Sequence, residues 1–114
     1  MIMAVVMTIL TVSAVFAAKP ATTIDTNTNG CDVTTTVDIA KGRGEANVRA
    51  YVLNMLNTEV RLFDRWYSGG EAETISAVSP VDSSMVYIES RRLDGKGALI
   101  DSEVLAVPMV CVIG

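Results

Sequence analysis

Apolar and polar residues alternate in short runs along most of the chain. Valine, isoleucine and threonine are abundant in these runs, and their β-branched side chains favour strands over helices. Strands are predicted over residues 33–39, 73–78, 85–91, 98–107 and 109–113. Glycine, proline and asparagine mark the breaks, at residues 29–30, 41–44, 68–70, 79–80, 94–97 and 108. Short strands with regularly spaced turns predict a mainly β fold, an antiparallel β-sandwich of the jelly-roll or Ig-like kind.

Residues 46–67 fit two structures. Their apolar residues fall at helical spacing, which would give one amphipathic helix and an α+β fold. Alternatively, the segment forms two strands, over residues 48–56 and 60–66, joined around Asn57 and Thr58. Asparagine at positions 54 and 57 suits a turn better than a helix interior, and strand patterns flank the segment on both sides. We therefore expect the hairpin.

The first 18 residues are apolar except for Thr8, Thr11 and Ser13, and none is charged. Small residues before Ala18 would suit a signal-peptide cut, although no basic residue precedes Lys19. The run is also just long enough to span a membrane, or it is retained to pack between subunits. We expect export by one of these routes. The expected domains are an export signal or retained assembly segment (1–18), a Thr/Asn-rich extended arm (19–31) and the β-sandwich (32–114).

Composition and charge narrow the function classes. The formal net charge of −4 and the sequence pI near 4.6 argue against a nucleic-acid partner. The absence of histidine removes the commonest general base and most zinc sites, and no other catalytic constellation is visible in the sequence. Trp66 and Tyr67 would suit an aromatic platform that binds carbohydrate. A lone aromatic cluster more commonly packs in the hydrophobic core and anchors it. We expect no enzyme and no cofactor.

Cys31 and Cys111 are the two cysteines of the chain. An even pair in an exported protein predicts a disulfide. A bond within the chain would close a loop of about 80 residues and add on the order of 4 kcal/mol of stability. A bond between neighbouring subunits is the alternative, because each cysteine lies near one end of the expected domain. We favour the bond within the chain.

Asp25, Asn27 and Asn29, followed by Gly30, match the first half of a calcium-binding loop. The twelfth position of such a loop should be a bidentate glutamate, but here it is Thr36. Aspartate and asparagine also cap turns, and an Asn-Gly pair suits a hairpin bend. We therefore predict no metal site, or at most weak calcium binding with a Kd of ~0.1–1 mM.

The runs Thr74-Ile75-Ser76-Ala77-Val78, Ser83-Ser84 and Val86 to Arg91-Arg92-Leu93-Asp94 resemble strand–turn–strand pairs in self-assembling β-sandwich subunits of bacterial surface appendages. Endospore appendage subunits are the family that they resemble most. That resemblance implies disulfides between subunits, and it transfers no functional residue to this chain. The apolar N-terminus is similar instead to that of secreted or type IV-like pilins, but it lacks their basic leader and ends early at Lys19-Pro20.

Two functions follow from these observations. The first is a structural subunit of an extracellular or cell-surface filament or pilus, which assembles with copies of itself through its N-terminal segment. It would contact a membrane only transiently, during export or assembly. The second is a monomeric secreted or periplasmic β-sandwich binding module with a cleaved signal peptide. We expect the first, because a domain of fewer than about 100 residues has little core in which to bury a retained apolar segment.

Overall fold

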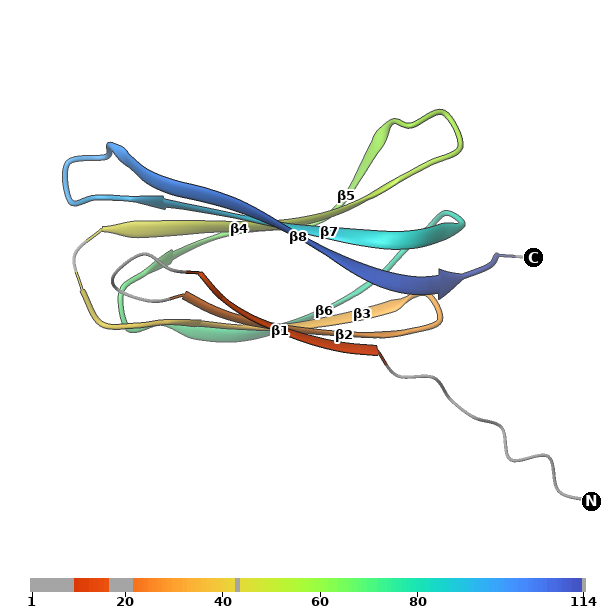
Figure 1. The fold of residues 1–114 in the computed structure, drawn as a ribbon, viewed down its shortest axis with the longest axis horizontal. Helices are drawn as coiled ribbons and strands as arrows, with labels where there is room; N and C mark the ends of the chain where they lie inside the picture. Colours follow the sequence, from red (N-terminus) through yellow and green to blue (C-terminus); the bar gives the residue numbers. More distant parts are fainter. Residues whose placement is uncertain (1–9, 17–21, 43, 114) are drawn as a thin grey trace, which may run out of the picture.

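The structure is a computed structural model that describes residues 10–16, 22–42 and 44–113. These residues form eight strands: β1 (Leu10–Phe16), β2 (Thr22–Asn29), β3 (Asp32–Ile39), β4 (Glu45–Leu53), β5 (Glu59–Ser68), β6 (Ala72–Val78), β7 (Ser83–Leu93) and β8 (Leu99–Cys111). Two antiparallel four-stranded sheets, β1-β2-β3-β6 and β5-β4-β7-β8, pack face to face (Figure 1). The predicted mainly β sandwich is confirmed. Within the described ranges no helix is long and apolar enough to cross a membrane.

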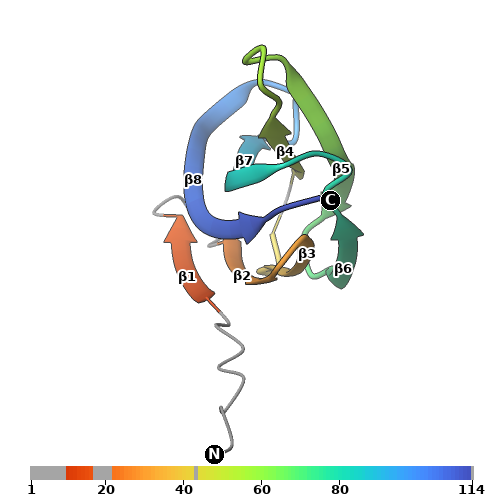
Figure 2. The same ribbon diagram turned by 90° about the vertical axis from the view of Figure 1, so that its right-hand side faces the viewer.

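Strands that follow one another in the sequence often pair within a sheet. The hairpins are β1–β2, β2–β3, β4–β5 and β7–β8. The chain changes sheet after β3, after β5 and after β6. The edge strands β1 and β8 lie against each other, and the edge strands β5 and β6 meet on the other side (Figure 2). The two sheets therefore enclose one core between them.

The core is built from alternate residues of each strand. Val33, Val37 and Ile39, which the sequence places on one face of a strand, are buried together with Thr35. The opposing sheet contributes Val48, Ala50, Val52, Phe63, Val86, Ile88 and Val107. Branched aliphatic side chains fill this thin core because they pack closely on a pleated surface.

The segment that we expected as an extended arm over residues 19–31 includes the core strand β2. Its buried residues are Thr22, Ile24, Thr26 and Thr28. The buried hydroxyl of Thr26 hydrogen-bonds that of Thr35 over 3.3 Å, and Thr28 donates to the carbonyl oxygen of Pro108 over 3.0 Å. Threonine has the branched shape of valine, so Thr26 and Thr28 pack in the core with their hydroxyls hydrogen-bonded. The sandwich therefore starts before the boundary that we expected.

The predicted hairpin over residues 46–67 is confirmed by β4 and β5. The first strand ends at Leu53, three residues earlier than expected, because Asn54 begins the turn. Its side-chain oxygen accepts hydrogen bonds from the backbone N–H groups two and four residues later, each over 2.9 Å. Asn57 completes the turn with a φ of 61°. Asparagine tolerates this left-handed conformation better than most residues.

The predicted break at Pro108 is wrong. The two strands expected over residues 98–107 and 109–113 are one strand, β8. Pro108 stands opposite Met85, where a β-bulge shifts the register of β7 and β8. Since β8 is an edge strand with a bulge at this position, a residue without a backbone N–H is tolerated there.

Candidate assembly site

β1 is the edge strand of the first sheet, and β2 is its partner among the described strands. All seven residues of β1 are paired, from Leu10 opposite Thr28 to Phe16 opposite Thr22. The sequence of β1 has apolar residues at positions 10, 12, 14 and 16, and these positions stand opposite the four buried residues of β2. Directly opposed residues of an antiparallel pair share a face of the sheet. The pattern of β1 therefore matches that of the strand with which it pairs.

Cys31 and Cys111 form a disulfide within the chain, with a sequence separation of 80. Cys31 lies in the turn between β2 and β3, and Cys111 ends β8, so the bond joins the two sheets at one end of the sandwich. The within-chain bond is confirmed, and among the described residues no free cysteine is left for a bond between subunits. The closed loop runs from residue 31 to residue 111, so β1 and β2 lie outside it. Such a bond is typical of an oxidising compartment outside the cytoplasm.

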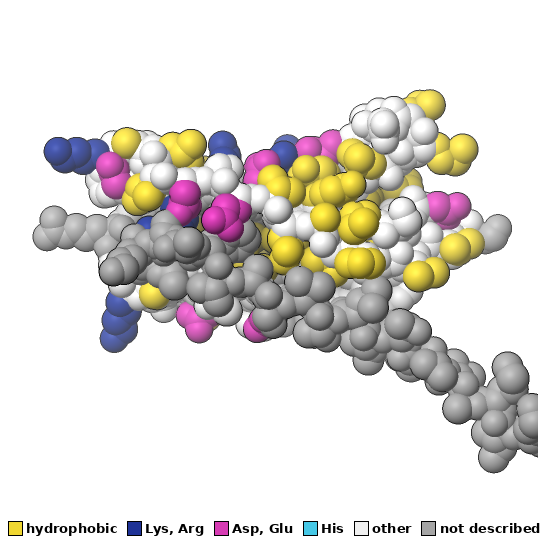
Figure 3. Space-filling model, viewed as in Figure 1, with side chains coloured by type: hydrophobic (Ala, Val, Ile, Leu, Met, Phe, Trp, Pro, Cys, Tyr) yellow, Lys and Arg dark blue, Asp and Glu magenta, His cyan; other side chains and the backbone are white. Residues whose placement is uncertain are grey.

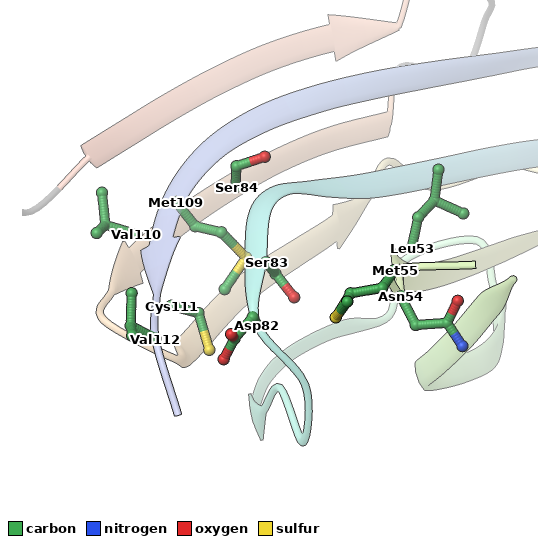
Figure 4. A pocket seen from close by; sticks show the side chains of 10 residues that line it. All are labelled: Leu53, Asn54, Met55, Asp82, Ser83, Ser84, Met109, Val110, Cys111 and Val112. Carbon is green, nitrogen blue, oxygen red and sulfur yellow. The ribbon is translucent and has the colours of Figure 1, made fainter. Parts of the chain in front are cut away.

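An apolar groove of about 430 Å³ lies at the disulfide end of the sandwich (Figure 4). Its walls are the β4–β5 turn, the start of β7 and the end of β8. The lining residues are Leu53, Asn54, Met55, Asp82, Ser83, Ser84, Met109, Val110, Cys111 and Val112. A second hollow of about 320 Å³ shares Asn54, Met55 and Asp82 with the groove and extends it to Leu56 and Ile113. We call the two hollows together the end groove.

The apolar side chains around the end groove are strongly exposed. Met55 is 96 % exposed and Leu56 is 84 % exposed at the tip of the β4–β5 turn. Val110 and Val112, at the end of β8 and just after it, are 71 % and 75 % exposed, and their side chains point away from Met55 (Figure 4). Hydrophobic side chains also gather toward this end in the space-filling view (Figure 3). Exposed apolar side chains that gather at one end of a domain mark an interaction site more often than residues scattered singly over the surface.

The turn that carries Met55 and Leu56 has a counterpart at the other end of the sandwich. Asp94, in the β7–β8 turn, accepts hydrogen bonds from the backbone N–H groups two and four residues later, as Asn54 does. The tip residues are Gly95 and Lys96 in that turn, where the β4–β5 turn has two apolar residues. The shared turn geometry therefore does not require apolar side chains at the tip.

The calcium candidates Asp25, Asn27 and Asn29 lie on a strand and not in a loop. They occupy the alternate positions of β2 that are not buried. Alternate residues of a strand are roughly 7 Å apart and their side chains run side by side, so they do not converge as a calcium loop requires. Asn29 and Gly30 make the bend into β3, with Gly30 at a φ of 60°. In the described part of the chain no cluster of three or more His, Cys, Asp or Glu residues could hold a metal ion.

The outer face of the second sheet carries a charged and aromatic cluster. Arg49 forms ion pairs with Glu59 over 2.7 Å and with Glu89 over 2.8 Å. Hydrogen bonds to Glu59 and Glu89 raise the pKa of Arg49 further above its usual range. Tyr51 stacks on Tyr87 with ring centroids 5.3 Å apart. These side chains bind one another and give β4, β5 and β7 a mutually satisfied polar surface.

Trp66 and Tyr67 point to opposite faces of β5, so they do not form one platform. Trp66 is half exposed, and the Arg91 guanidinium lies 6.0 Å from its ring centroid. Tyr67 is buried in the core and donates a hydrogen bond to Glu73 over 2.7 Å. Burial raises the pKa of Tyr67, and the hydrogen bond to Glu73 raises it further. Tyr67 is a core anchor, as expected, and Trp66 is a surface residue.

Comparison with protein-family models gives no match to this chain, and a search of curated proteins gives none either. The resemblance to appendage subunits stays a prediction.

Two features of the site were missed in the sequence. The alternation in residues 10–16 indicates a strand, but it lies inside a continuous apolar run that also suits an export signal. The expected strand over residues 48–56 includes residues 55 and 56, so their exposure at the tip of a turn is not predicted from the sequence.

Proposed function

We propose that the chain is a structural subunit of an extracellular filament, in which β1 of one copy occupies the place beside β2 of the next copy. The observation that supports this most strongly is the position of β1. It is an edge strand, it precedes every other described strand, and it lies outside the loop closed by the disulfide. β1 can therefore leave the sandwich while the disulfide stays intact and the other strands keep their order.

An exchanged strand makes the same contacts as the original strand. The seven residue pairs between β1 and β2 are identical whichever copy supplies β1. Exchange of an identical element is a low-cost route to assembly, and strand addition satisfies backbone groups that an open edge leaves unpaired. Without any β1, the buried residues of β2 would stand at an uncovered edge of the core.

The geometry of this exchange favours an open chain of subunits. The donated strand and the place that accepts it are different surfaces of one molecule, so the contact is heterologous. Heterologous contacts build filaments unless the rotation between copies closes a ring. Residues 17–21 connect Phe16 of β1 to Thr22 of β2 and, fully extended, let these two residues lie at most about 22 Å apart, which limits the spacing of neighbouring copies.

The disulfide also supports an extracellular location. It closes a long loop in a small domain, and such bonds persist where thiols are not kept reduced. The partners in this function are copies of the same chain, and contact with a membrane is limited to export or assembly.

A pair of cysteines across β1 and β2 tests the exchange. Ser13 stands opposite Asp25, so we would make Ser13→Cys together with Asp25→Cys in the full chain and oxidise the assembled protein. We expect a ladder of covalently linked chains on denaturing, non-reducing electrophoresis, because each new bond joins two copies. The matched control is Asp25→Cys with Thr36→Cys, which are opposed on β2 and β3 of one chain. It should run as a monomer.

If the assembled and oxidised protein with Ser13→Cys and Asp25→Cys runs as a monomer in the same electrophoresis, the exchange is refuted. An exported protein that begins near residue 18 and stays monomeric at high concentration would refute the filament function itself. In that case the secreted binding module would replace it, because β1 would be absent from the mature chain.

A further inference from the structure

The exposed tip of the β4–β5 turn is a part of the end groove whose apolar side chains the turn does not need. Met55 and Leu56 occupy a turn whose counterpart is formed with Gly95 and Lys96, so their apolar side chains contribute nothing to the hydrogen bonds of the turn. The groove has one charged lining residue, Asp82, whose carboxylate already accepts the backbone N–H of Ile113 over 2.7 Å. The lining of the end groove therefore favours an uncharged and largely apolar occupant.

β1 begins at this same end of the sandwich, and residues 1–9 precede it in the sequence. Leu10 stands opposite Thr28 at one end of β1, and Thr28 donates a hydrogen bond to the carbonyl oxygen of Pro108 over 3.0 Å. Pro108 immediately precedes Met109, which lines the groove. Nine extended residues reach about 30 Å, which is long enough to cross the groove.

We infer that residues 1–9 of the chain whose β1 lies beside β2 dock in the end groove. This inference rests on the proposed function, because it requires the N-terminal segment to be retained. In the filament the docked residues come from the neighbouring copy, and in a closed monomer they come from the same chain. The docked segment would extend the contact between copies beyond the seven residue pairs of β1 and β2.

The chemistry of the segment fits the groove. Residues 1–9 read MIMAVVMTI, with Thr8 as the one polar side chain. Methionine occurs in both partners, at three positions of the segment and at Met55 and Met109 of the groove. Its flexible, polarizable side chain adapts to irregular apolar surfaces. Docking would remove from water the exposed side chains of Met55 and Leu56.

Photo-cross-linking tests the docking. We would place a benzophenone amino acid at Val5 of the full chain, irradiate the assembled protein, and map the cross-links by mass spectrometry after digestion. We expect cross-links to residues 53–56 and 109–113. Replacing the turn tip by that of the other turn, Met55→Gly with Leu56→Lys, should lower their yield at least about tenfold, because two apolar side chains lose their burial.

The matched control is Leu99→Lys, which replaces an exposed apolar residue near the other end of the sandwich. It should leave the yield within about twofold, as expected for a surface substitution away from the contact. Cross-links that map elsewhere, or that persist after the turn replacement, would overturn the docking. Mixing isotope-labelled and unlabelled chains separates the two proposals: groove cross-links confined to single chains in the filament would refute the strand exchange and leave the docking intact.

Discussion

Reduction of the bond between Cys31 and Cys111 should lower the free energy of unfolding by about 4 kcal/mol. The bond spans a sequence separation of 80. In the chain-entropy model, closing a loop of about 80 residues lowers the entropy of the unfolded chain and raises its free energy by roughly 4–5 kcal/mol at 25 °C. Small domains have total stabilities of about 5–15 kcal/mol, so this is a large fraction. The midpoint of thermal unfolding should fall by on the order of 20 °C, given a shift of about 4–8 °C per kcal/mol in a domain of this size.

Urea unfolding of the oxidised and reduced protein, followed by circular dichroism, measures this difference. We expect the reduced protein to unfold with a steeper dependence on urea, because its unfolded chain is no longer cross-linked and exposes more surface. The variant Cys31→Ala with Cys111→Ala is the control for effects of the reductant, and it should behave like the reduced protein. A loss below about 1 kcal/mol with an unchanged slope would refute the reasoning that the bond acts by restricting the unfolded chain.

Four further predictions follow from the contacts. Phe63→Ala should destabilise the sandwich by about 3–5 kcal/mol in urea unfolding, because a buried aromatic side chain leaves a cavity. Asn54→Ala should cost about 1 kcal/mol by the same assay, since the turn loses two hydrogen bonds to backbone N–H groups. The pKa of Tyr67 is raised in the folded state, so the unfolded chain loses the phenol proton at a lower pH than the folded chain does. The stability that the protonated Tyr67 contributes is therefore fully present below about pH 10 and should be lost as the pH rises above that value. Tyr67→Phe should remove that part of the alkaline loss in unfolding measured as a function of pH. Deleting residues 1–18 removes β1, so the truncated chain should form no filaments in electron micrographs and should bind a peptide of residues 10–16 in calorimetry.

Much of the fold could be predicted because local signals and packing agree. On β3, valine at positions 33 and 37 and isoleucine at position 39 share one face of a strand, and the same face is buried in the sandwich. Turn chemistry located the β4–β5 hairpin, since Asn54 and Asn57 both have the roles in the turn that their side chains suit. The two cysteines predicted a disulfide, but the choice between one chain and two needed the tertiary structure.

The rest depends on tertiary context that the sequence does not carry. Pro108 stops a strand only where its missing N–H is needed, and an edge position with a bulge removes that need. The threonines of β2 predict a polar, extended arm when the sequence is considered alone. Whether a threonine hydroxyl can be buried depends on a partner that is distant in the sequence, such as the carbonyl oxygen of Pro108. The apolar N-terminal run suits a membrane, an export signal and a strand equally well, and only pairing with β2 identifies the strand in residues 10–16. The end groove joins the β4–β5 turn to β8, which are far apart in the sequence.

Electron cryo-microscopy of the assembled protein tests the central claim most directly. The density map would show which subunit supplies the strand that pairs with β2. We predict that residues 10–16 lie antiparallel to β2 and that residues 17–21 lead from them to β2 of a neighbouring subunit. A connection that returns to β2 of the same subunit, or subunits joined with no strand in this place, would contradict the account.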